Sequence, residues 1–172
     1  SRAGLFQIHA ACVRGPARAV LIAGKTGAGK STLACAFVAR GAEAISDDRT
    51  LLFLENGRAM ASASHERPNP FCLWAGIDPR DVIENRVPLP RLHEDATPGP
   101  VPVAGIVFPE VAHDQESVLT SLRPPHAAAR LLSGYFFNDR PPEAVMALVE
   151  AAARLSAFSL KSGAGLDSLS PL

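Results

Sequence analysis

Residues 24–31 read Gly24-Lys25-Thr26-Gly27-Ala28-Gly29-Lys30-Ser31, which matches G-x-x-x-x-G-K-[ST] at every fixed position. The glycines allow a tight turn in which successive backbone N–H groups converge on phosphate oxygens. In this pattern the lysine reaches the β- and γ-phosphates and the following hydroxyl ligates Mg²⁺. We therefore expect this stretch, together with Thr32, to bind a nucleotide, with Ser31 as a metal ligand.

The sequence on either side supports this interpretation. Residues 19–23 form a short, continuous apolar run, which is typical of a strand buried on both faces. Residues 31–40 place Leu33, Ala34, Phe37 and Val38 at helical spacing, and Gly41 follows where a helix commonly ends. The order strand, glycine-rich loop, helix is the context that this motif requires.

The rest of the chain predicts a mixed α/β domain. Asn56-Gly57 lies between two strand-like runs and indicates a hairpin. The proline-rich residues 65–102 predict little regular structure. We expect one domain, residues 1–161, followed by a flexible tail, residues 162–172. Besides residues 19–23, the expected strands are 5–13, 43–46, 50–54, 58–63 and 103–108, and the further helices are 125–137 and 142–157.

Composition excludes several classes of protein. Of 172 residues, 47% are hydrophobic, which argues against global disorder, and 17 basic residues balance 17 acidic ones, which gives no sign of a nucleic-acid partner. No apolar run approaches the roughly 20 residues of a membrane helix, so we expect no membrane association. The three cysteines are far apart and predict reduced thiols in a cytoplasmic protein.

Two adjacent carboxylates, Asp47 and Asp48, follow an apolar stretch shortly after the loop. One could hold Mg²⁺ and the other could accept the proton of an attacking hydroxyl. The alternative interpretation is a solvated turn. His9 lies within the first expected strand, where a histidine serves either packing or a site.

Together these residues resemble the catalytic domain of HPr kinase/phosphorylase, a bacterial enzyme that phosphorylates a serine of the phosphocarrier HPr. His9 precedes Gly24 by fifteen residues, as in that family, and Arg40-Gly41 leads through a hydrophobic step into Asp47-Asp48. The resemblance covers residues 8–54. Beyond them, Ser64-His-Glu-Arg-Pro-Asn-Pro70 differs from the glycine-rich signature of the family that is linked to phosphorolysis.

The resemblance implies a role for each of these residues. Lys30 would stabilise the transferring phosphoryl group, and Asp48 would be the base, with Asp47 beside it. His9 would support that carboxylate. The metal ligands would be Ser31, Asp47 and, as the nearest acidic candidate, Glu66.

The expected fold is thus α/β, a P-loop, HPr kinase-like mixed sheet with flanking helices. The expected activity is ATP-dependent phosphorylation of a serine on a protein or peptide, either an HPr-like partner or the precursor of a peptide natural product. Related kinases form oligomers, so a homo-oligomer is also expected. The alternatives are a kinase for a small metabolite and a nucleotide-binding sensor that transfers no phosphate.

Overall fold

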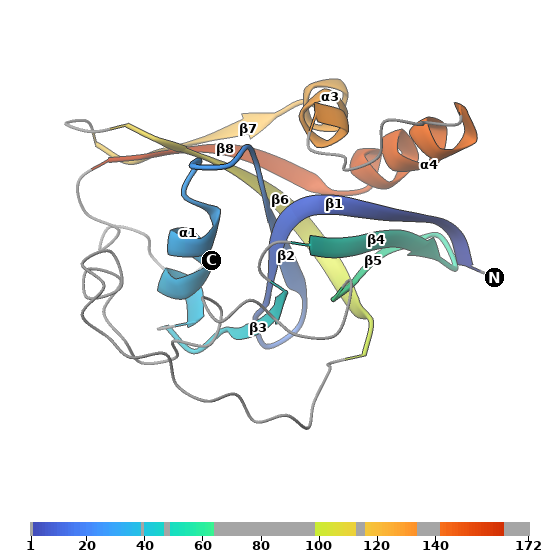
Figure 1. The fold of residues 1–172 in the computed structure, drawn as a ribbon, viewed down its shortest axis with the longest axis horizontal. Coiled ribbons are helices and arrows are strands. Elements are labelled where there is room, and N and C mark those ends of the chain that lie inside the picture. Colours follow the sequence, from blue (N-terminus) through green and yellow to red (C-terminus); the bar gives the residue numbers. More distant parts are fainter. Residues whose placement is uncertain are drawn as a thin grey trace.

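The computed structural model describes residues 2–38, 40–46, 49–63, 99–112, 116–133 and 142–163 (Figure 1). Within these ranges the chain forms eight strands and three helices. The strands are β1 (Arg2–Arg14), β2 (Ala19–Ala23), β3 (Glu43–Ser46), β4 (Arg49–Glu55), β5 (Arg58–Ala63), β6 (Val101–Val111), β7 (Val118–Leu122) and β8 (Ser156–Ser162). The helices are α1 (Lys30–Val38), α3 (Pro124–Ser133) and α4 (Pro142–Ala153).

Two long strands, β1 and β6, connect the whole sheet. Its order is β2-β1-β4-β5-β6-β8-β7, with β3 beside β1 and a further pairing between β2 and β6. Strands β2 and β8 both run parallel to β6, whereas β1 runs antiparallel to β2, β3 and β4. The sheet is therefore mixed, as the sequence predicts, and β2 is enclosed between β1 and β6.

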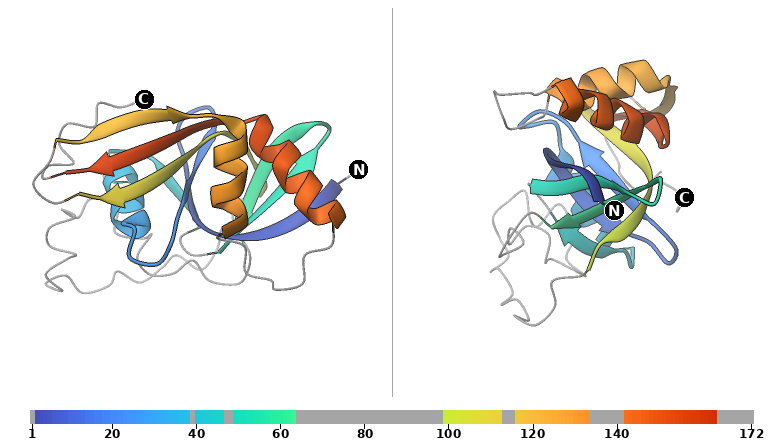
Figure 2. Two further views of the ribbon diagram at one scale, coloured as in Figure 1. Left: turned by 90° about the horizontal axis from the view of Figure 1, so that it is seen from above. Right: turned by 90° about the vertical axis from the view of Figure 1, so that its right-hand side faces the viewer.

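Helices cover both faces of the sheet (Figures 1 and 2). On one face α1 packs through Leu33 and Val38 against β1, β2 and β6. On the other face α3 and α4 pack through Leu131 and Leu148 against a larger core that includes Phe6. Alternate residues of β2 belong to different clusters, because successive side chains of a strand point to opposite faces. The apolar run at residues 19–23 is thus buried on both sides, as the sequence predicts.

The predicted hairpin is confirmed. Asn56 and Gly57 connect β4 to β5 with φ of 50° and 75°, the pair of positive angles that a type I′ turn requires. Another glycine is set by close packing rather than by a turn. A Cβ on Gly105 would lie 2.8 Å from the carbonyl oxygen of Ser156, so only glycine lets β6 approach β8 at this point.

Some expected boundaries are wrong. The last helix ends at Ala153 and not at residue 157, because Ser156 and Ala157 begin β8, which pairs along the length of β6. Strand β7 was not expected at all, and Pro102, assigned to an irregular segment, lies in β6. Strand β8 continues to Ser162, the first residue of the expected tail.

Most of the proline-rich segment, residues 64–98, lies outside the described residues. No helix in the described ranges is both long and apolar enough to span a membrane.

Candidate active site

The glycine-rich loop connects the carboxyl end of β2 to the start of α1. Gly27 and Gly29 have φ of 81° and 93°, conformations that side chains with a Cβ rarely adopt. The carbonyl of Gly29 accepts the first helical hydrogen bond, from the N–H of Leu33 at 2.9 Å. The remaining N–H groups of the first turn of α1 therefore face the loop, and the positive end of the helix dipole points the same way. Free N–H groups at a helix N-terminus are, in general, favourable for an anion.

Lys30 is the first residue of α1, and its side chain folds back toward the glycine-rich loop. Its Nζ donates a hydrogen bond of 3.1 Å to the carbonyl of Lys25, and the residue is only 6% exposed. Lys25 and Thr26 are themselves exposed, whereas Ser31 and Thr32 are half-buried. A positive charge is thus held at the loop with little freedom, which suits a group that stabilises phosphate.

The carboxyl end of β6 forms one wall beside the loop. A Cβ on Gly29 would lie 3.3 Å from Cγ2 of Val111, and one on Gly24 would lie 3.9 Å from the carbonyl oxygen of Pro109. Between these two residues of β6 lies Glu110, which is exposed. Glu110 is not among the residues expected at the site, although an acid two residues after a buried-type strand is a usable signal for a residue at the ligand edge of a parallel sheet.

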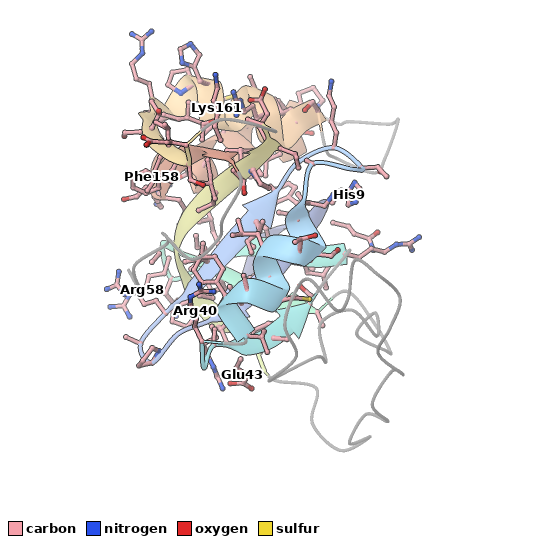
Figure 3. The ribbon with its side chains drawn as sticks, turned by 90° about the vertical axis from the view of Figure 1, so that its left-hand side faces the viewer. His9, Arg40, Glu43, Arg58, Phe158 and Lys161 are labelled. Carbon is pink, nitrogen blue, oxygen red and sulfur yellow. The ribbon has the colours of Figure 1, made fainter. Side chains whose placement is uncertain are left out.

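His9 lies on β1, between the loop and the strand that follows the two aspartates. The next residue, Ala10, pairs with Ala23 at the end of β2, and His9 itself pairs with Arg49 at the start of β4. Figure 3 shows His9 at the end of α1 where the loop lies. The register of one strand therefore brings His9 next to the entrance of the loop, and His9 is half-buried there.

The residues that flank Asp47 and Asp48 are fixed to the same strand. The hydroxyl of Thr50 donates to the carbonyl of Ala10 at 2.7 Å, and the hydroxyl of Ser46 lies 2.6 Å from that of Thr50. Both hydroxyls are buried. Asp47 and Asp48 themselves lie outside the described residues. Ser46 precedes the pair and Thr50 follows it, and their hydroxyls connect both to Ala10, the residue that pairs with Ala23.

The metal ligands expected from the sequence are only partly described. Ser31 lies in the first turn of α1, whereas Asp47 and Glu66 are outside the described ranges. Among the residues that the structure describes, no three histidine, cysteine or acidic side chains gather as a metal cluster. A serine hydroxyl beside a glycine loop is nevertheless an oxygen ligand of the kind that Mg²⁺ accepts, usually with carboxylates and phosphate oxygens.

Cys12 is an inert neighbour of the site. It lies on β1 two residues after Ala10, and burial raises the pKa of its thiol to about 12. The thiol therefore stays protonated at neutral pH and is a poor nucleophile. Cys35 is also buried and free, in keeping with the expected reduced thiols, and Cys72 lies outside the described part of the chain.

Comparisons with known proteins give a likeness in structure but none in sequence. No family model and no curated protein sequence matches this chain. Among solved structures, the Hpr(Ser) kinase/phosphatase from Coxiella burnetii is similar, with 18% sequence identity and a TM-score of 0.44. The match covers 91% of this chain and 85% of that one.

Proposed function

We propose that this protein is an ATP-dependent kinase that transfers the γ-phosphate to a serine hydroxyl of a protein or peptide. The observation that supports this most is the register of β1. It brings the phosphate-type loop, His9 and the anchored flanks of Asp47-Asp48 to one edge of the sheet. An anion site and a carboxylate next to each other are the two elements that transfer from a triphosphate to an alcohol requires.

In this proposal the loop binds the triphosphate. Backbone N–H groups of residues 24–32 and the start of α1 hold the phosphate oxygens, and Lys30 stabilises the charge that develops on the transferred group. Ser31 and Asp47 would hold Mg²⁺, which supplies positive charge that neutralises the phosphates when bound. Glu66 is a further proposed ligand. The tight glycine turn and the buried Lys30 support this assignment, because the backbone N–H groups of such a turn converge on an anion and the lysine holds a positive charge at the loop.

The carboxylate of Asp48 is the proposed base. It accepts the proton of the serine hydroxyl while the serine oxygen bonds to the γ-phosphorus and the bond from that phosphorus to the β–γ bridging oxygen breaks, releasing ADP. Asp47 lies beside it, and His9 is a positioning residue that holds the carboxylate. The partly buried position of His9 next to the loop supports this role.

The direct test is incubation of the protein with γ-labelled ATP, Mg²⁺ and a set of serine peptides, each matched by an alanine peptide. We expect label in the serine peptides alone, with one mass shift of a phosphoryl group per serine modified. Label on small alcohols in a parallel panel, with none on peptides, would show a metabolite kinase instead. Nucleotide binding without any labelled acceptor would show a sensor. Either result would overturn the proposal.

A further inference from the structure

A concave site lies at the other end of α1 from the glycine-rich loop. It is a cavity of about 580 Å³ between the second half of the helix and the sheet. Its apolar lining includes Val13, Val20, Leu33 and Phe37. Figure 3 shows Arg40, which also lines it, at the end of α1 away from His9. A cavity of this size is in the range of small-molecule sites, which run from about 300 to 1,000 Å³.

The cavity exists because of a bulge and several small side chains. In the pairing of β2 with β6, Ala19 lies opposite Val103 and Val20 opposite Gly105, which leaves Ala104 as an extra residue. Ala104 lines the cavity, and so do Ala36 and Ala42 from the helix side. A larger residue at any of these positions would fill space that the present sequence leaves open.

Among the described residues that line this cavity, the charged ones are both arginines. They are Arg18 and Arg40, and none of the described lining residues is an aspartate or glutamate. The nearby Glu43 is in an ion pair with Arg14. Among the residues that the structure describes, the side chain of Arg18 makes no hydrogen bond or ion pair, whereas Arg40 donates to the carbonyl of Ala36 at 3.1 Å.

The end of α1 does not cancel this charge. A helix carboxyl end normally carries partial negative charge on its free carbonyls. Here the N–H groups of Arg40 and Ala42 both donate to the carbonyl of Phe37, and the N–H of Gly41 donates to that of Val38. These bonds give the carbonyls of Phe37 and Val38 hydrogen-bond partners, as in a Schellman-type cap, which reduces the free partial negative charge beside the two arginines.

We propose that this cavity binds an amphipathic monocarboxylate, with its apolar body between α1 and the sheet and its carboxylate against Arg18 and Arg40. The apolar lining offers little to hydrogen-bond a polar body, whereas guanidinium groups pair with carboxylates in a two-pronged geometry. The site is separate from the phosphate loop and belongs to no step of the proposed phosphoryl transfer.

The charge recognition is tested by calorimetry on the whole chain with decanoate, decanol and decylammonium, each kept below its aggregation concentration. We expect decanoate to bind and the other two to bind at least about tenfold more weakly. Arg18→Glu should weaken decanoate binding by about tenfold or more. Arg123→Glu, an exposed arginine on the α3 side of the sheet, should change it less than twofold. Equal binding of decanol, or an equal loss in both variants, would overturn the proposal.

The location is tested by filling the cavity. Ala104→Phe should abolish decanoate binding while the thermal midpoint shows that the protein stays folded. If that variant does not fold, Ala42→Leu, at a half-buried position beyond the helix, replaces it. Lys30→Ala should bind decanoate as the wild type does. Wild-type affinity in the filled variant, or loss of decanoate binding in Lys30→Ala, would place the ligand elsewhere and refute the assignment.

Discussion

The side-chain hydroxyl of Thr50 donates a hydrogen bond of 2.7 Å to the backbone carbonyl of Ala10, and both residues are completely buried. Ala10 pairs with the last residue of β2, directly before the phosphate-type loop. Thr50 follows the aspartate pair by two residues and also contacts the hydroxyl of Ser46. The buried hydroxyl of Thr50 thus connects Ala10, at the entrance of the loop, to the residues on either side of Asp47 and Asp48.

Replacing this hydroxyl should destabilise the fold. Thr50→Val keeps the shape of the side chain but leaves the carbonyl of Ala10 and the hydroxyl of Ser46 without that partner, which should cost about 1–3 kcal/mol in the free energy of unfolding. Urea titration followed by circular dichroism measures this. The matched control is Thr120→Val on the exposed β7, expected to change stability by less than about 0.5 kcal/mol. Equal effects would contradict the assigned role of Thr50.

The aspartate pair should be needed for transfer and not for nucleotide binding. Asp48→Asn removes the proposed base, and such groups typically contribute about 10²–10⁴-fold to the rate. We expect a loss of transfer of that order in the labelled-phosphate assay, with the affinity for a fluorescent ATP analogue within about threefold of wild type. Unchanged turnover would exclude Asp48 as the base. Asp47→Asn, measured alongside, should show a stronger dependence of the rate on Mg²⁺ concentration.

Removing the loop lysine should impair both steps. Lys30→Ala deletes a buried ammonium that donates to the carbonyl of Lys25. In calorimetry we expect a lower affinity and a smaller binding enthalpy for a non-hydrolysable ATP analogue. We also expect the rate of phosphoryl transfer to fall by about 10²-fold or more. Lys25→Ala is the control, because that side chain is exposed. A Lys30 variant with full affinity and full turnover would rule out the loop as the phosphate site.

Adding one methyl group in the loop should separate binding from stability. Gly29 has φ of 93°, and a Cβ there would lie 3.3 Å from Val111, so Gly29→Ala should strain the loop and weaken nucleotide binding at least about tenfold. Gly57→Ala has a comparable φ of 75° and open space, but it lies in the β4–β5 hairpin. Both variants should lose stability, while Gly57→Ala should bind the nucleotide normally. Similar nucleotide affinities in the two variants would contradict the proposed site.

Alkaline pH should destabilise the protein through Cys12. Burial raises the pKa of its thiol in the folded state from 9.0 to about 12. Between these values the unfolded chain loses the proton and the folded chain keeps it, so the free energy of unfolding falls as pH rises, by up to about 1.4 kcal/mol per pH unit. Comparing wild type with Cys12→Ala by urea titration from pH 8 to pH 10.5 isolates this effect. Parallel curves would show that the thiol does not contribute.

The local parts of the fold were predictable because neighbouring residues determine them. The glycine spacing of residues 24–31 and the Asn56-Gly57 turn each specify a backbone conformation within a few residues. The continuous apolar run at residues 19–23 likewise predicts a strand that is buried on both faces. These elements were therefore found with nearly correct bounds.

The long-range parts were not predictable. Nothing in the sequence near Ala10 indicates that it pairs with Ala23 or accepts a bond from Thr50, forty residues away. The first two residues of β8, Ser156 and Ala157, are predicted as the end of a helix, because the apolar spacing that precedes them continues as far as Ala157. The pairing of β8 with β6 decides the outcome, and that pairing depends on Gly105.

Strand β1 belongs to two arrangements at once, since its first half pairs with β4 and its second half with β2 and β3. A slip of this strand by one residue would turn its inward side chains outward in both halves together. A shift in register would therefore expose buried side chains in both halves of β1. An insertion or deletion within β1 should be tolerated far less than one in the β4–β5 turn. Strand β1, which carries His9, thus also disfavours incorrect strand pairing during folding.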